Sequence, residues 1–313
     1  MVGNSTWQTM ENADIIAMMN TTMDYGAAVV ANVQGGGGFY TPDGTGPDGF
    51  GNAINSTSTA GTREAWFPLN IFTAGGPARA HLVAGAPHQS FRIKLTYATV
   101  GALGVGSITP TKPLVEMWAR QHIMTNFERD QIRSNTIAKS LYLTQHMEQS
   151  VSGSGSTSVE CDSFSLLASH LLVTLEKDNL PGDAEVLQTV ELLLNTSSHS
   201  GQLDAGFMVA STGNAMGLKT YTTLTPLSGF GGTSSAVEDI DGGSSAGSIA
   251  RVTYVFPIAA TPWGPDGCPF NRFDTIRLKL SFQGNFTGTV SVTCCGTASA
   301  VYAKQAASLQ YHS

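Results

Sequence analysis

A histidine and an aspartate are the side chains in this sequence that are best suited to acid–base chemistry. His170 lies in the strand-like stretch 169–174, and histidine is the commonest general base because its ordinary pKa is close to neutral pH. No nucleophile motif accompanies it, since the sequence contains neither a G-x-S-x-G elbow nor an H-E-x-x-H pair. Asp274 stands before another strand-like stretch and close to Arg272. We therefore expect His170 to be a half-exposed strand residue and Asp274 to be a salt-bridging or turn-capping carboxylate.

Two groups of residues have the chemistry to bind a metal ion. The cysteines are Cys161, Cys268, Cys294 and Cys295; they include no CxxC pair, and two adjacent cysteines cannot easily chelate one ion. The acidic segment 238–243 resembles part of a calcium loop but lacks the required spacing of aspartates and the closing glutamate. We predict no catalytic, cofactor-binding or metal-binding residues, and we expect a solvated acidic loop. The thiols are expected to be partly buried, outside disulfides and in a reducing cytosol.

The overall charge argues against nucleic-acid binding. The chain of 313 residues has a formal net charge of −7, and no cluster of Lys and Arg is present that could neutralise several phosphates. Charged residues make up only 12% of the chain, about half the usual share. With 35 glycines, this composition favours strands joined by turns, or a surface buried against neighbours, over an enzyme with a solvated surface. We expect no enzymatic activity.

The clearest secondary-structure signal is strict alternation in two segments far apart in the sequence. In Phe91–Tyr97 and in Ile276–Phe282, apolar side chains alternate with Arg, Lys and a hydroxyl residue, which is the period of a half-buried strand. A Phe-Pro-apolar tripeptide precedes each of them, at 67–69 and at 256–258. Two matched segments in the same order indicate an ancient duplication and therefore two similar domains.

The remaining patterns divide the chain into two β-rich halves. We predict a first domain over 1–130 with long loops in 1–62, and a second domain over 131–313 with a short linking helix near 131–149. The helix is expected because 137–148 is rich in helix-permissive residues. Short strands with long loops and almost no long helix favour a sandwich or jelly roll. Other expected strands are 66–72, 164–176, 186–194 and 249–258, and the Gly/Ser-rich segments 35–62 and 229–248 are expected to be loops at the outer surface or between subunits.

Five segments in collinear order resemble the double jelly-roll major capsid proteins of nucleocytoplasmic large DNA viruses. The most specific runs from Tyr254-Val255-Phe256-Pro257-Ile258 to Asn271-Arg272-Phe273-Asp274-Thr275-Ile276-Arg277-Leu278 and is similar to the family's "YSFAL" and "NFSRIDNVRL". The others are 66–88, 127–145, 164–175 and 307–313. Together they extend from about residue 65 to the end of the sequence.

The resemblance implies an all-β fold of two tandem jelly-roll barrels and the role of a major capsid protein. It implies homotrimers of pseudo-hexagonal outline that tile an icosahedral shell and contact neighbouring capsomers, minor capsid proteins and, indirectly, an internal membrane layer. It also implies a location in the virion after assembly in the host cytoplasm. The family's first strands are not recognisable here, so we expect that the first barrel is incomplete, or that residues 5–62 or another chain supply the missing edge.

Two alternatives from other functional classes remain. A carbohydrate-binding jelly roll needs an aromatic platform, for which Trp66, Trp263 and Tyr221 are the candidates. A cupin-like enzyme needs clustered His and Glu ligands, and the sequence offers no such cluster.

Overall fold

The computed structural model describes the second half of the chain almost completely and a few segments of the first. The described residues are 2, 4–9, 82, 86, 88–96, 117, 123–178, 187–208, 249–260, 266–303 and 306–311. The predicted strand 66–72 and the predicted loops 35–62 and 229–248 lie outside them. Among the described residues, no helix is both long and apolar enough to cross a membrane.

A helix lies near the predicted position, but it begins and ends earlier than predicted. Helix α3 spans Asn126–Ser134 and starts with a capping box, in which Thr125 accepts from the N–H of Glu128 while the Glu128 carboxylate accepts from the N–H of Thr125. The segment 137–148, predicted to be helical, is instead the start of strand β1 (Ile137–Glu160). Its prediction as a helix was wrong because hydrogen bonding to a distant strand overrides a weak local preference.

Seven further strands follow β1 in the part of the chain that the structure describes. Three of them match predicted strands closely, namely β2, β3 and β5. The strands are β2 (Leu167–Asp178), β3 (Leu187–Leu194), β4 (Ser197–Asp204), β5 (Ile249–Pro257), β6 (Cys268–Pro269), β7 (Ile276–Ala303) and β8 (Ala306–Gln310), with the short helices α4 (Ala205–Phe207) and η6 (Phe270–Arg272) between them.

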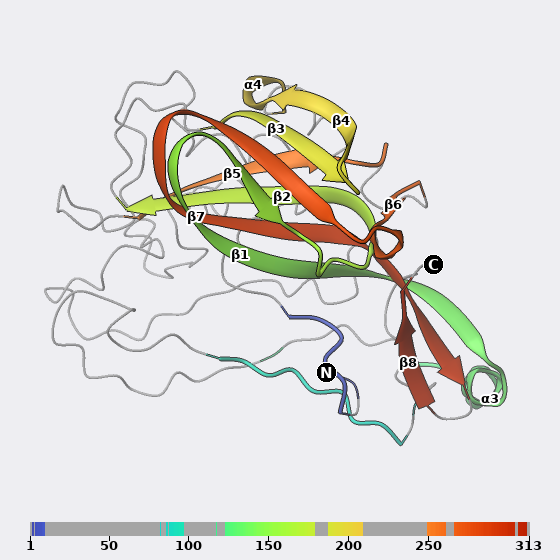
Figure 1. Cartoon of the computed structure of the whole chain (residues 1–313). Helices are drawn as coiled ribbons and strands as arrows, with labels where there is room; N and C mark the ends of the chain where they lie inside the picture. Colours follow the sequence, from blue (N-terminus) through green and yellow to red (C-terminus); the bar gives the residue numbers. More distant parts are fainter. Residues whose placement is uncertain are drawn as a thin grey trace, which may run out of the picture.

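Strands β1 and β7 are long and bend together, so that each takes part in two sheets (Figure 1). Residues 137–154 of β1 pair antiparallel with 285–302 of β7, and residues 156–160 pair with 277–281. The first of these β7 segments also pairs with β2, which pairs with β5. The second also pairs with β3, which pairs with β4. The result is two four-stranded layers that share the bent strands.

Leaving aside the short strands β6 and β8, one layer has the order first arm of β1, second arm of β7, β2 and β5. The other layer has the order second arm of β1, first arm of β7, β3 and β4. This is the strand order of a jelly roll, a two-sheet β fold. The all-β prediction is therefore confirmed, and a complete jelly roll is formed within residues 137–303.

The bend of β7 centres on Gly284, whose φ of 86° lies in the left-handed region that residues with a Cβ avoid. Phe282 and Phe286 flank this glycine, and their rings stack with centroids 4.7 Å apart. Both rings are buried. A flexible backbone position between two packed aromatic rings thus turns the strand from one sheet into the other.

The alternation predicted for Ile276–Phe282 is confirmed. Ile276, Leu278, Leu280 and Phe282 are buried in the core, and the residues between them are half-buried. The same pattern in 91–97 does not give a half-buried strand over its described residues: Ile93 and Leu95 are 46% and 42% exposed, and 92–96 belong to no strand. A bridge joins the backbones of Phe91 and Val2 at the start of this stretch.

Candidate functional site

The predicted histidine lies in a buried Ser–His pair on β2. Ser169 Oγ lies 3.0 Å from His170 Nδ1 and donates a hydrogen bond to the carbonyl oxygen of Cys295, also at 3.0 Å. Because the single hydroxyl proton goes to that carbonyl, Nδ1 carries a proton and Nε2 is the unprotonated nitrogen. Within the described part of the chain, Nε2 has no hydrogen-bond partner.

This pair has the composition of a nucleophile and its base but not the accessibility. The prediction that His170 is half-exposed was wrong, since its side chain is 0% exposed, and Ser169 is 2% exposed. Burial lowers the pKa of His170 from its ordinary value of 6.5 to about 3, so the ring is neutral in the folded protein. A substrate cannot reach either side chain in this conformation, and we assign the pair a structural role.

The error has an identifiable cause in the sheet that contains β2. The side chains on its face opposite the core are also buried, which is unusual for an antiparallel sheet. Several polar residues on that face are buried together with His170, namely Thr144, Thr174, Ser291, Thr293 and Thr297. A strand that is buried on both sides cannot be recognised from the polarity of one histidine.

The cysteines show no sign of catalytic chemistry. All four are buried and none is in a disulfide. Burial raises the pKa of Cys161 to about 12 and also raises the pKa of Cys294, which disfavours the reactive thiolate form. Among the described residues, no group of three or more His, Cys, Asp and Glu side chains is arranged to hold a metal ion. The acidic segment 238–243 lies outside the described residues.

Side chains from two other loops fix the turn that leads into β7, where the segment most similar to capsid proteins lies. Asn195 Oδ1 accepts hydrogen bonds from the backbone N–H groups of Asp274 and Thr275, at 2.9 and 3.1 Å. Asp162 Oδ1 accepts from the N–H of Ile276 at 2.6 Å. The structure thus places capping side chains on Asn195 and Asp162, whereas Asp274, the predicted cap, is held through its own backbone. The turn is a structural junction of three loops.

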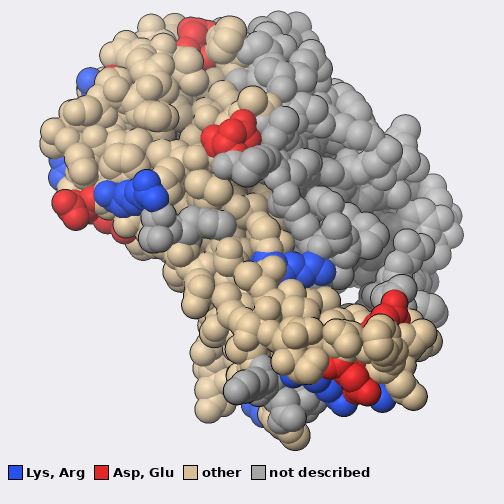
Figure 2. Space-filling model, turned by 90° about the vertical axis from the view of Figure 1, so that its right-hand side faces the viewer, with Lys and Arg blue, Asp and Glu red and all other residues tan. Residues whose placement is uncertain are grey.

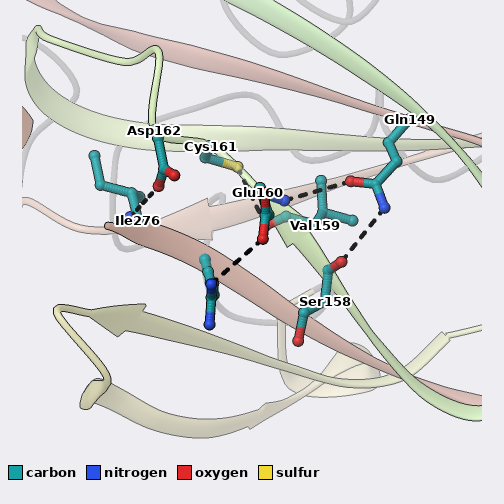
Figure 3. A network of polar contacts seen from close by, with 8 residues as sticks. Gln149, Ser158, Val159, Glu160, Cys161, Asp162 and Ile276 are labelled. Atoms are coloured by element: carbon teal, nitrogen blue, oxygen red, sulfur yellow. Dashed lines mark hydrogen bonds and ion pairs between the residues drawn. The ribbon is translucent and has the colours of Figure 1, made fainter. Parts of the chain in front are cut away.

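Figure 3 shows the polar network around Asp162 and the adjoining end of β1. Gln149 reaches from the first arm of β1 to the second, where its Oε1 accepts from the N–H of Glu160 and its Nε2 donates to the carbonyl of Ser158, both at 3.4 Å. The Glu160 carboxylate pairs with Arg277 at 3.4 Å. These contacts tie the two sheets together at one side of the barrel.

The surface offers apolar side chains and few charges. Ile123 is 89% exposed and Phe127, on α3, is 73% exposed, and no residue of α3 is buried. Figure 2 shows that charged side chains on this face gather in small separate patches with wide uncharged areas between them. Such a surface suits contacts with other protein subunits. The aromatic residues proposed for carbohydrate binding, Trp66, Trp263 and Tyr221, lie outside the described residues.

The strand order and the two-layered core define residues 137–303 as a jelly roll, a fold shared by viral capsid proteins, lectins and cupins. The sequence matches no protein-family model, and a search of curated proteins finds no match.

Comparison with solved structures finds similar chains among viral capsid proteins. The chain in the quasi-atomic model of the PBCV-1 virus capsid is 12% identical, with a TM-score of 0.41, over 61% of this chain and 55% of that one. The major capsid protein P2 from Bacteriophage PM2 is 10% identical, with a TM-score of 0.30, over 50% and 45% of the two chains. A chain of the Sputnik virophage is 10% identical, with a TM-score of 0.28, over 56% and 39%. The chain thus spans about half the length of the PBCV-1 chain.

Proposed function

We propose that this protein is a major capsid protein, a structural subunit that forms homotrimers of pseudo-hexagonal outline and tiles an icosahedral viral shell. The observation that carries the proposal is the position of the family-like segments on the jelly roll. Of the five, 127–145 covers most of α3 and the start of β1, 164–175 covers most of β2, and 307–313 includes most of β8. The most specific segment covers the end of β5 and the turn into β7.

The physical properties of the chain support the same role. A shell subunit works by presenting a rigid shape with surfaces that neighbours bury, and it needs no reactive group. The buried Ser169–His170 pair and the buried thiols suit packing better than catalysis. Exposed apolar side chains such as Phe127 and sparse surface charge suit lateral burial, because a charge at an interface must be desolvated.

The proposed partners follow from this role. They are two further copies of the chain in the trimer, neighbouring capsomers, minor capsid proteins and, indirectly, an internal membrane layer. The proposed location is the virion, after assembly in the host cytoplasm.

The test is the assembly state of the purified full-length chain and its place in particles. Sedimentation velocity is expected to show a species of three times the monomer mass, and electron microscopy of that species is expected to show a pseudo-hexagonal outline. Antibody labelling of purified virions is expected to decorate the shell. A chain that stays monomeric across the concentration range and is absent from the shell contradicts the proposal. Specific binding on a glycan array by that monomer would instead support a carbohydrate-binding module.

A further inference from the structure

The ends of β1 and β7 form, together with β8, a three-stranded extension of the barrel. Strand β2 pairs with β7 as far as Thr297. Beyond that point, residues 299–303 of β7 lie between residues 137–140 of β1 and the whole of β8. In Figure 1 this extension leaves the barrel beside α3. Segments from the first half of the sequence meet the barrel at this extension.

One face of the extension continues the hydrophobic core. The residues of β7 and β8 on that face are buried in the core cluster or packed against it, namely Ala300, Tyr302, Ala307 and Leu309. Residues from the first half of the sequence belong to the same cluster or pack against it, namely Val2, Trp7, Leu82, Ala86 and Phe91. The extension and these segments therefore share one apolar core.

A turn in the first half of the sequence brings a glutamine side chain to β8. The N–H of Gln89 donates to the carbonyl of Ala86 at 3.0 Å and closes a four-residue turn. The sequence has Pro87 at the second position, where such turns favour proline. Gln89 Oε1 accepts from the backbone N–H of Ala307 at 2.7 Å. Because an N–H has a single proton, this group points away from β7, and Gln89 lies along the outer edge of β8.

A second hydrogen bond joins the first half of the sequence to β7. The N–H of Leu82 donates to the hydroxyl oxygen of Tyr302 at 3.2 Å. Tyr302 is the ladder partner of Ala307, so the two contacts are made at directly opposite positions of β7 and β8. The bridge between Phe91 and Val2 extends this connection to the N-terminal residues.

We propose that β8 is a latch between the two halves of the chain, and that the partner of its outer edge is the turn 86–89 of the same chain. The Gln89 side chain makes the hydrogen bond that holds the turn to β8. Residues 88–96 belong to no named strand, so side-chain contacts and packing fix their position. Loosening β8 therefore loosens the first-half segments while the two layers of the barrel stay intact.

The latch also has a consequence for assembly. A subunit that contributes two corners to a pseudo-hexagonal trimer needs its two halves in a constant relation, and a latch between them maintains that relation. This consequence rests on the proposed function, whereas the latch itself does not.

The experiment measures amide hydrogen exchange in the full-length chain and in variants at Gln89. Q89L keeps the size of the side chain but removes the acceptor, and Q89E keeps an acceptor oxygen at the same place. Q310L is the matched control, because it is the same substitution at an exposed position of β8. We expect exchange over 88–91 and over β8 to accelerate about fivefold in Q89L, as for the loss of one hydrogen bond of ordinary strength. In Q89E and Q310L the acceleration is expected to stay below about twofold, and exchange over β3 is expected to stay unchanged.

A double variant tests whether Gln89 acts through Ala307. A307P removes the N–H that donates to Gln89, and proline is tolerated at an outer strand edge. Since both substitutions remove the same hydrogen bond, adding Q89L to A307P is expected to give no further acceleration over 88–91. If A307P does not fold, the comparison of Q89L with Q89E decides, and equal acceleration in these two variants contradicts the latch.

The latch is overturned if exchange over 88–91 is unchanged in Q89L, or if the effects of Q89L and A307P add. It is also overturned if β3 accelerates by the same factor, which indicates global destabilisation. Sedimentation of the unaltered chain tests the capsid role separately, so that the failure of one proposal can be distinguished from the failure of the other.

Discussion

Replacing Gly284 by alanine tests whether the bend of β7 depends on a left-handed backbone. The position is suited to this test because a Cβ built on Gly284 meets no atom within 4 Å. Any loss of stability in G284A therefore comes from the backbone conformation and not from a steric clash with neighbouring side chains.

The expected loss follows from two opposing effects. Placing an L-residue at a φ of 86° costs about 1–2 kcal/mol relative to glycine. Alanine also restricts the unfolded chain, which favours folding by about 0.4–1 kcal/mol. We expect a net loss of about 1 kcal/mol in the free energy of unfolding, which is large enough to measure by urea denaturation followed by circular dichroism.

The loss of stability in G284A can be compared with the losses in two further variants. G284N is expected to lose less than half as much as G284A, because asparagine tolerates the left-handed region. G296A is expected to lose more, about 3 kcal/mol, because a Cβ on Gly296 overlaps the backbone carbonyl of Leu167 on β2. If G284A is as stable as the unaltered chain, or if G284N is the worse of the two, the bend does not depend on backbone conformation as we argue.

Three other predictions concern groups described above. In the folded protein His170 is neutral, with a pKa of about 3, whereas in the unfolded chain it takes up a proton below pH 6.5. The contribution of the neutral ring to the stability of the fold is therefore complete above pH 6.5 and is lost as the pH falls toward 3. From pH 6.5 to pH 4 the unaltered chain is expected to lose about 3 kcal/mol more stability than H170L, as measured by denaturant titration at each pH; equal acid sensitivity of the two proteins contradicts this. N195G tolerates the positive φ of 47° but removes the acceptor for two backbone N–H groups, so the free energy of unfolding is expected to fall by about 1 kcal/mol. N195A is expected to lose about 1 kcal/mol more, because alanine disfavours that φ. Equal losses in the two variants would exclude a contribution from the backbone conformation. The four cysteines are expected to react with a thiol reagent only after unfolding, and rapid labelling of the native chain argues against their burial.

Strands that bury only one of their two faces could be predicted from the sequence. Ile276–Phe282 alternates because its second face is only half-buried, and the pattern therefore shows in the residue types. Strand β3 shows a similar alternation of buried and less buried residues. The segments similar to capsid proteins added the jelly-roll fold, which no local pattern can provide.

The rest depends on contacts between residues far apart in the chain. Residues 137–148 carry helix-permissive side chains, but their pairing with β7 makes them a strand. His170 is buried because both faces of its sheet are covered, and the caps on the turn into β7 come from loops 79 and 114 residues away in the sequence. Neither arrangement leaves a signal at the residues themselves.

The double use of β1 and β7 has a consequence for how the protein folds. Ile137 pairs with Tyr302, 165 positions later in the chain, and this pairing closes the barrel. Since β7 is a member of both sheets, neither layer can be completed on the ribosome before β7 has been made. Contacts of such long range slow folding, because the entropy of closing the loop is lost before the contacts form. We therefore expect the barrel to form only after β7 has been made, with the earlier strands exposed in the interval and dependent on chaperones to keep them from aggregating.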